Sequence, residues 1–332
     1  MDGAFTTYLE TGSTDPAYNL AFEETVLQSR REGAVLILWQ NANTVVIGQN
    51  QNAEAEINRA FVEAHGVRVV RRMTGGGAVY HDLGNLNYSF FADVEHAETL
   101  TFRQFTQPVA EALRALGLEA EASGRNDILA AGRKVSGTAQ RLLNGRVLHH
   151  GTLLFDSNPE MLAGALRADP AKFQSKGTQS VRARVGNIRP LLREDMDMPA
   201  FWAYVKTALG GKKLHPDTLT EAELAQVRRL KEEKYDTWAW NFGRSPKFSM
   251  LRKRRWDGGT LEIGANVEAG YITELRFYGD FLSLCPLKPL ETALTGLPFR
   301  REDISAVLEK QPLGLYFGAL TAEQVLETMF NG

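Results

Sequence analysis

Residues 71–85 read RRMTGGGAVYHDLGN, and no other stretch of the chain is as informative. The three consecutive glycines, Gly75 to Gly77, lack a Cβ, so the backbone there can adopt unusual φ angles and approach a ligand closely. Backbone N–H groups in such a loop can face an anion, and the two arginines before it add positive charge. These features favour a site for phosphate or an acyl phosphate. The alternative is an ordinary loop that joins two strands.

The glycine loop departs from two common phosphate-binding patterns. A G-x-x-x-x-G-K-[ST] run is absent, and Tyr80 occupies the position of the last glycine in G-x-G-x-x-G. The sequence therefore favours neither a P-loop protein nor a dinucleotide-binding protein.

Strand-like runs rich in Val, Ile and Leu surround this loop, and a hairpin follows it. Asn144-Gly145 is a strong signal for a two-residue turn, because both residues tolerate positive φ. We expect strands at 34–39, 44–47, 67–70, 87–91, 135–143, 146–155, 260–267 and 271–278. Helical spacing or capping residues predict helices at 16–33, 109–116, 159–166, 199–209, 221–234, 287–294, 302–309 and 321–330.

This order of elements predicts an α+β fold in two domains. Hairpins interrupt the alternation of strand and helix, which disfavours a doubly wound sheet. We expect a large catalytic domain over residues 1–243, with a mixed or antiparallel sheet surrounded by helices. A small α+β accessory domain would follow over residues 246–332, with a hinge near Gly243. The length of 332 residues also suits two domains.

Composition excludes several classes of protein. The 38 basic and 40 acidic residues give a net charge of −2, which argues against a protein that mainly coats nucleic acid. The longest apolar run, 34–39, is too short for a membrane span, and the first residues lack the basic region of a secretory signal. One cysteine excludes an internal disulfide and a cysteine zinc cluster. We therefore expect a soluble cytoplasmic protein.

Two further stretches carry candidate site residues. Lys134 stands in RKVSG (133–137), where its ammonium could donate to an oxyanion or a phosphate, although a solvated charge is the usual role of a lone strand lysine. Asp127 in GRND (124–127) could hold Mg²⁺ or cap a turn. His149 and His150 would point to opposite faces of their strand, so at most one faces a site, and His150 could equally be a packed histidine.

Together these stretches resemble the lipoate–protein ligase A family. The family pattern R-R-x-x-G-G-G-x-V-x-H-D-x-G-N is met at every fixed position of residues 71–85. The segments GRND, RKVSG and HHGTLL (149–154) are also similar to that family, as are WQN (39–41), VIG (46–48) and WNFG (240–243). The resemblance runs through essentially the whole chain.

The resemblance implies a two-step reaction. ATP and lipoate would form lipoyl-adenylate and pyrophosphate with the help of Mg²⁺. A lysine of an apo lipoyl domain would then take the lipoyl group and release AMP. The acceptors implied are acyltransferase subunits of 2-oxoacid dehydrogenases and the glycine-cleavage H protein, and we expect the ligase to be a monomer.

The resemblance also implies roles for individual residues. Lys134 would be the catalytic residue and would contact both ATP and lipoate. The other implied ATP contacts are Arg72, Gly77, Ala78, Val79 and Tyr80. From the residues themselves we further expect Gly75, Gly76 and His150 to contact lipoate or the adenylate and Asp127 to hold Mg²⁺. Our own hypothesis places the apolar lipoyl tail near Val46, Val70 and Val79. Gln49 stands where these ligases often carry arginine after V-I-G, which puts one cationic contact in doubt.

The cysteine distinguishes between related activities. Octanoyltransferases and lipoyl amidotransferases of the same fold use a catalytic cysteine. Residues 1–242 contain none, and we expect Cys285 to pack as a small hydrophobe. The GRGRRGR-like loop of biotin–protein ligases is also absent. Two alternatives stay open: a lipoyltransferase that uses only preformed lipoyl-AMP, and a noncatalytic protein that binds lipoate or its adenylate.

Two basic segments could steer an acidic acceptor domain. The first contains Arg182, Arg184, Arg189 and Arg193, and the second is residues 252–255 at the start of the small domain. Ordinary solvated surface charge is an equally good explanation of each.

Overall fold

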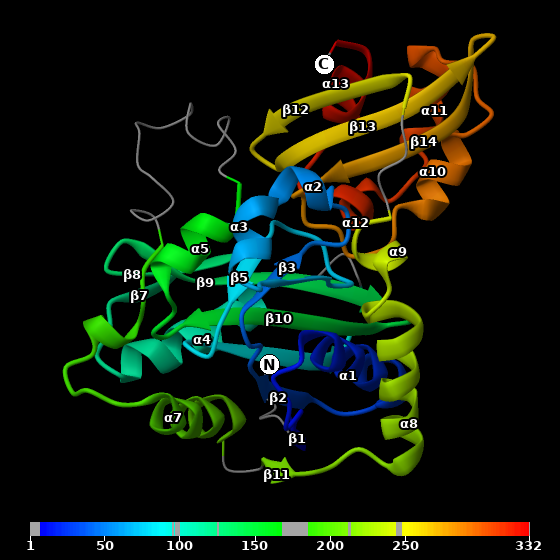
Figure 1. Cartoon of the computed structure of the whole chain (residues 1–332). Coiled ribbons are helices and arrows are strands. Elements are labelled where there is room, and N and C mark those ends of the chain that lie inside the picture. Colours follow the sequence, from blue (N-terminus) through cyan, green and yellow to red (C-terminus); the bar gives the residue numbers. More distant parts are fainter. Residues whose placement is uncertain are drawn as a thin grey trace. The chain divides into compact units, whose positions relative to one another are not determined.

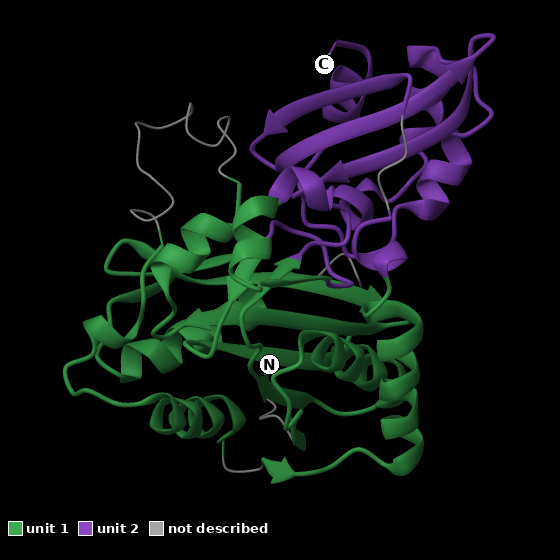
Figure 2. Ribbon diagram, viewed as in Figure 1, with its two compact units in different colours: residues 1–46, 57–70, 79–237 green, residues 47–56, 71–78, 238–332 purple. Residues whose placement is uncertain are grey.

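The computed structural model describes residues 7–94, 96, 100–124, 126–167, 185–211, 214–243 and 248–331 (Figure 1). Its contacts divide the chain into two compact units (Figure 2). Unit 1 contains residues 1–46, 57–70 and 79–237, and unit 2 contains residues 47–56, 71–78 and 238–332. Unit 2 therefore combines the glycine loop with the C-terminal part of the chain. Both units mix helices and strands, which confirms the α+β class.

Unit 1 is built on one eight-stranded sheet. Its strands, in spatial order, are β11 (His215–Pro216), β1 (Thr7–Glu10), β2 (Val35–Trp39), β6 (Asn85–Asp93), β10 (Arg146–Leu154), β9 (Arg133–Leu143), β8 (Asp127–Ala130) and β7 (Ala120–Ser123). Strand β1 runs parallel to β2 and β11, and the other neighbours are antiparallel. The sheet is thus mixed, as the sequence predicts.

The β9–β10 hairpin confirms the prediction from Asn144-Gly145. Both turn residues have positive φ, 48° and 75°, and Leu143 pairs with Arg146. Because side chains alternate along a strand, His149 and His150 face opposite sides of the sheet. His149 stacks on Phe105 of helix α4 (Arg103–Ala115), whereas His150 contacts Glu23 of helix α1 (Pro16–Ser29). Helices α4 and α1 therefore cover opposite faces.

Apolar packing holds the α4 face together. Helix α7 (Met198–Gly210) packs beside α4, and Phe90, Phe105 and Phe201 are buried in this core. On the other face, α1 packs against α8 (Glu221–Leu230) and the π-turn Lys231–Tyr235. No helix in the described part of the chain is long and apolar enough to cross a membrane.

Two predicted helix boundaries are wrong. Helix α1 begins at Pro16, with Asp15 as N-cap, but it ends at Ser29 and not at Gly33. Arg30 leaves the helical conformation, and its guanidinium pairs with Asp217 and Glu223, which lie far along the chain. Helix α4 begins at Arg103, six residues before the expected start, because the helix accommodates Pro108 in its interior.

A second, three-stranded sheet carries the segments around the glycine loop. Its strands are β4 (Arg68–Arg71), β3 (Thr44–Ile47) and β5 (Val79–His81), with β3 in the centre. Short helices α2 (Ala53–Glu56), α3 (Arg59–Ala64) and α5 (Pro159–Ala165) and a 3₁₀ turn (Arg189–Leu191) complete the connections.

The C-terminal part of unit 2 is an antiparallel meander with helices on its apolar face. The strands are β12 (Met250–Trp256), β13 (Gly259–Glu268) and β14 (Tyr271–Gly279). These helices are α10 (Lys288–Leu294), α11 (Arg301–Leu308), α12 (Leu313–Phe317) and α13 (Ala322–Asn331). The short helix α9 (Trp238–Asn241) precedes the meander and is bonded to Arg71. The basic segment 252–255 lies in the edge strand β12, which the sequence patterns did not predict. Cys285 packs against the core of this meander.

Candidate active site

The glycine loop in unit 2 is organised from inside by Arg72. Its buried guanidinium donates to the Thr74 hydroxyl (2.9 Å) and to the carbonyl oxygens of Gly75 (2.7 Å) and Gly77 (2.8 Å). Its main-chain N–H donates to the carbonyl of Ile47 at 3.0 Å. A positive charge therefore sits within the loop and fixes its curvature.

The surroundings of the three glycines differ, so the need for glycine has a different reason at each position. A Cβ on Gly75 would lie 2.7 Å from the main-chain nitrogen of Ser283, and Gly76 has a φ of +88°. Next to the loop, a Cβ on Gly48 would fall onto the carbonyl oxygen of Gly76. In contrast, a Cβ on Gly77 would meet only Asp280, at 3.9 Å. Packing thus requires glycine at 75 and 76, whereas Gly77 leaves space that a ligand could use.

Residues 279–283 of the same unit hold this loop and the neighbouring loop 48–51. The Gly76 N–H donates to the carbonyl of Phe281 (3.1 Å), and the Gly279 N–H donates to the carbonyl of Asn50 (2.8 Å). The Asn50 amide also donates to the Ser283 hydroxyl at 2.8 Å. Sequence analysis missed these contacts because nothing in residues 279–283 marks them as partners of a segment two hundred residues away.

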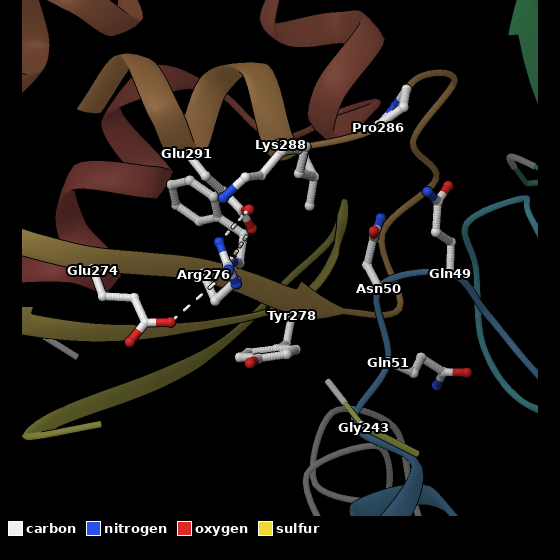
Figure 3. Close-up of a pocket in the computed structure, with 12 residues that line it drawn as sticks. Gln49, Asn50, Gln51, Gly243, Glu274, Arg276, Tyr278, Pro286, Lys288 and Glu291 are labelled. Atoms are coloured by element: carbon white, nitrogen blue, oxygen red, sulfur yellow. Dashed lines mark hydrogen bonds and ion pairs between the residues drawn. The ribbon is translucent and has the colours of Figure 1, made fainter. Parts of the chain in front are cut away.

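Unit 2 also contains a cavity of about 530 Å³ (Figure 3). Its lining comes from residues 49–51, from β14 and from the start of α10. Arg276 pairs there with Glu291 (3.0 Å) and Glu274 (3.8 Å), and Lys288 adds a second cation. Burial raises the pKa of the Glu291 carboxyl. Two cations facing two acids give this cavity no preference for phosphate, and none of the predicted site residues lines it.

Lys134 and Asp127 come together in unit 1. The Lys134 ammonium lies 2.7 Å from Oδ1 of Asp127, and both side chains are about one-third exposed (35% and 33%). A Cβ on Gly137 would lie 2.9 Å from the Lys134 ammonium, so the lysine side chain extends over this glycine. The β8–β9 pairing, with its irregularity at Ile128/Leu129, brings the two predicted residues side by side.

Polar side chains continue along the same face of the sheet. The register places Asn87 opposite Thr152, and the Thr152 hydroxyl accepts a hydrogen bond from the Gly137 N–H (3.2 Å). His150 follows on this face, two residues before Thr152. The part of this face around Lys134 is therefore polar, although buried Leu148 and Phe91 lie further along the same face. The opposite face forms the apolar core with α4 and α7.

A buried carboxylate fixes His150. Its Nδ1 lies 3.0 and 3.2 Å from the two carboxylate oxygens of Glu23, which is 1% exposed. Glu23 also accepts a hydrogen bond from Ser89, whose hydroxyl accepts one from the Trp39 indole (2.8 Å). Sequence analysis missed Glu23. The available signal was the pair of acids Glu23 and Glu24 between apolar residues of a predicted helix (AFEETV, 21–26).

The residues after the glycines form strand β5. Val79 pairs with Val46 and Tyr80 pairs with Val45. The Tyr80 hydroxyl donates to Asn43 (2.9 Å), and burial together with the Asp82 charge raises the pKa of Tyr80 to about 12. The phenol is thus engaged within the protein, so a nucleotide contact at Tyr80 would come from its main chain.

The donor set at Asp127 suits a magnesium ion that is shared with a substrate. The part of the chain that the structure describes contains no cluster of three or more His, Cys, Asp or Glu side chains able to hold a metal. Mg²⁺ usually keeps several waters and binds through one or two carboxylates plus substrate phosphates. A single carboxylate fits that mode through Oδ2 of Asp127, because the Lys134 ammonium already lies at Oδ1.

Both ends of the chain match known families. Residues 15–210 match the model for the lipoyl protein ligase A/B catalytic domain, and residues 245–329 match that for the bacterial lipoate protein ligase C-terminus. The chain belongs to the lipoate–protein ligase family. The resemblance seen in the sequence is thereby confirmed.

Individual lipoate–protein ligases resemble the chain over most of its length. A lipoate-protein ligase from Bacillus subtilis is 40% identical over 321 residues, which cover 95% of this chain and 97% of the relative. A bi-partite ligase from Thermoplasma acidophilum, solved in a study that includes its E2 lipoyl domain, is 30% identical, with a TM-score of 0.64 over 75% of this chain and all of that chain. A lipoate-protein ligase A bound with ATP is also 30% identical, with a TM-score of 0.60 over 73% of this chain and 99% of that chain.

The predicted site residues of this ligase-family member are distributed over both units. Lys134, Asp127 and His150 belong to unit 1 with Val79 and Tyr80. Arg72, Gly75, Gly76, Gly77 and Ala78 belong to unit 2. The surroundings of Lys134 are thus held by contacts within unit 1, and the glycine loop is held by contacts within unit 2.

The basic segments of this ligase-family member are partly neutralised. Arg189 pairs with Asp156 (2.9 Å) and Asp195 (2.8 Å). In β12, Arg254 pairs with Glu327 (3.2 Å) and Arg255 with Asp280 (2.8 Å). Arg182 and Arg184 lie outside the described residues.

Proposed function

We propose that this chain is an ATP-dependent lipoate–protein ligase. It activates lipoate as lipoyl-adenylate and transfers the lipoyl group to a lysine of apo lipoyl domains. The observation that carries the proposal is the Lys134–Asp127 pair on the polar sheet face of a domain that belongs to this ligase family. The relatives' names and the ATP-bound ligase structure support both substrates.

In the first step, a lipoate carboxylate oxygen attacks the α-phosphorus of ATP, and the bond to pyrophosphate breaks. Lys134 supplies positive charge to the lipoate carboxylate and the α-phosphate, where negative charge accumulates. Arg72 and residues 77–80 hold ATP, and Gly75, Gly76 and His150 hold lipoate or the adenylate. Asp127 holds Mg²⁺, which neutralises phosphate charge when bound.

In the second step, the acceptor lysine nitrogen attacks the acyl carbon of the mixed anhydride. The carbon–oxygen bond to AMP breaks, the nitrogen loses a proton and an amide remains. No protein nucleophile is required. This agrees with the position of Cys285, whose thiol contacts the carbonyl of Leu315 in the small-domain core.

Acceptors in our proposal are lipoyl domains of 2-oxoacid dehydrogenase acyltransferase subunits and the glycine-cleavage H protein. The archaeal ligase with its E2 lipoyl domain supports the first class. We further propose that the protein works as a cytoplasmic monomer. The catalytic portion, residues 1–243, would form the adenylate, and residues 246–332 would form an accessory domain that moves about a hinge near Gly243.

One observation favours a narrower activity. Gln49 lacks the charge that many ligases carry after V-I-G, so a transferase that accepts only preformed lipoyl-AMP is the second candidate. A protein that binds lipoate or its adenylate without transferring it is a third.

The test is pyrophosphate release from ATP, Mg²⁺ and lipoate without an acceptor, followed by addition of an apo lipoyl domain. Lipoate-dependent release and a mass gain on the domain lysine are expected of the complete ligase. Modification only when synthetic lipoyl-adenylate is supplied would identify the transferase. Tight lipoate binding without any modified acceptor would refute both enzymes.

A further inference from the structure

Arg71, the neighbour of Arg72, is a fully internal arginine of unit 2 with 1% exposure. Its guanidinium donates hydrogen bonds to five main-chain carbonyl oxygens. These acceptors are Gly48 (2.9 Å), Gln49 (3.1 Å) and Gln51 (2.6 Å) for Nη1, Trp240 (2.9 Å) for Nε and Asn241 (2.9 Å) for Nη2.

The guanidinium determines the shape of the loop 48–51. Three carbonyl oxygens from four successive residues converge on one nitrogen, Nη1. Their dipoles would repel one another without a cation between them, because the site is buried and screening is weak. A planar guanidinium has several donors in fixed directions and suits this arrangement, whereas a lysine ammonium does not reproduce it.

The loop 48–51 in turn constrains the glycine loop. Gly48 lies so close to the carbonyl of Gly76 that no Cβ fits between them. The Gln49 N–H donates to the carbonyl of Thr74 at 2.8 Å. A shift of Gly48 or Gln49 must therefore displace the residues on both sides of Gly75.

The same arginine also fixes residues 240 and 241. Its N–H donates to the Asn241 side-chain oxygen, and its carbonyl accepts from the Trp240 indole, both at 2.8 Å. With the two guanidinium bonds to the carbonyls of Trp240 and Asn241, four hydrogen bonds join Arg71 to helix α9. One residue thus connects three chain segments: loop 48–51, the start of the glycine loop, and α9.

We infer that Arg71 is a positioning residue for ATP. It holds the loop 48–51, which sets the position of Thr74 and Gly76 and therefore of Gly77 and Ala78, which follow in the same unit. The inference rests on the proposed function, in which residues 77–80 contact ATP. Arg71 itself touches no reacting atom. Because misplacement by about 1 Å can cost 10²-fold in an enzyme, its effect is large although indirect.

The test compares Arg71→Lys with a matched control, Arg146→Lys. Arg146 is likewise buried, at 0% exposure, and donates to Asp93 and to the carbonyl of Gly33 in unit 1 (both 2.7 Å). Both substitutions remove a buried guanidinium and should lower the melting temperature. Only Arg71→Lys is expected to raise the KM for ATP in lipoate-dependent pyrophosphate release, by about 10- to 100-fold, and to weaken ATP binding in calorimetry by a similar factor.

A second variant keeps the test decisive if Arg71→Lys does not fold. Asn241→Ala removes the acceptor of the Arg71 N–H and leaves the guanidinium in place. It should raise the KM for ATP in the same direction, by a smaller factor. An unchanged ATP affinity in the folded Arg71 variant, or an equal loss in Arg146→Lys, would overturn the inference. If the wild-type protein released no pyrophosphate, the proposed function would fail. Calorimetry would still test whether Arg71→Lys weakens ATP binding.

Discussion

The ammonium of Lys134 and the Asp127 carboxylate form an ion pair of 2.7 Å on the face of the sheet that also carries Thr152 and His150. Both residues are partly exposed, so water screens their attraction and the pair contributes little to stability. The ion pair instead fixes the position of the Lys134 side chain, which extends over Gly137. Substitutions here should therefore affect the reaction much more than the fold.

Lys134→Ala is expected to lower lipoate-dependent pyrophosphate release by roughly 10²–10³, the range for loss of one positioned donor to a developing anion. The melting temperature should change little. Lys206→Ala is the matched control, since Lys206 has the same side-chain exposure of 35% and pairs with Glu10. Near-normal turnover of Lys134→Ala would remove this lysine from the mechanism.

Asp127→Asn tests the magnesium role. The substitution keeps the shape but removes the charge, so the Mg²⁺ concentration for half-maximal activity should rise by about tenfold or more. Asp156→Asn, which breaks the pair with Arg189, should leave the magnesium dependence unchanged. A normal magnesium titration in Asp127→Asn would mean that the carboxylate serves only to hold Lys134.

Two glycine substitutions should separate packing from ligand contact. Gly76→Ala forces a side chain into a φ of +88° and should cost about 1–2 kcal/mol of unfolding free energy. Gly77→Ala has room within the protein, so its stability should be near normal while the KM for ATP rises several-fold. Urea denaturation and ATP titration of both variants measure the two effects. Equal ATP affinities in Gly77→Ala and wild type would contradict a nucleotide contact there.

The buried His149 predicts a loss of stability in mild acid. Burial lowers the pKa of His149 well below its ordinary value, and the neighbouring His150 charge lowers it further. The unfolded chain therefore binds the proton first as pH falls through about 6.5, and unfolding becomes easier. When the pH is lowered from 7.5 to 5.5, His149 should therefore reduce the free energy of unfolding by about 1.4 kcal/mol.

The comparison is with His149→Phe, measured by urea unfolding at both pH values. Phenylalanine keeps the stacking on Phe105 and cannot titrate. The variant should therefore lose about 1.4 kcal/mol less than wild type over this interval. If the free energies of unfolding of the two proteins fell equally between these pH values, the prediction would be contradicted, because His149 would not bind its proton preferentially in the unfolded chain.

Local signals in the sequence located the helices of seven or more residues and the strands of the β9–β10 and β13–β14 hairpins, whereas strands β1, β5, β7, β8, β11 and β12 were not predicted. Asp15-Pro16 begins α1, and Asn144-Gly145 closes the β9–β10 hairpin, because both depend on neighbouring residues only. The end of α1 could not be predicted, since Arg30 finds its acids near residue 220. Strand β12 was not predicted because charged residues occupy both of its faces, so the alternation of apolar and polar residues is missing.

The sequence nominated candidate site residues one by one, but it did not predict how they are arranged. Lys134 and Asp127 were each candidates, yet their contact depends on the pairing of β8 with β9 and its irregularity. Glu23 was missed because a carboxylate in an apolar helix has no local partner. The bracing of the glycine loop by residues 279–283 was also missed, because its hydrogen bonds use main-chain groups that every sequence shares.

The two-residue turn of the β9–β10 hairpin limits which changes in length this hairpin can accept. A single residue inserted at Asn144-Gly145 would offset β10 against β9 by one position if the turn kept its two-residue form. His149 would then turn toward the carboxylate of Glu23, and His150 would enter the aromatic core. An insertion that shifted β10 would thus disrupt both faces of the sheet, whereas one that only lengthened the turn would leave both histidines in place.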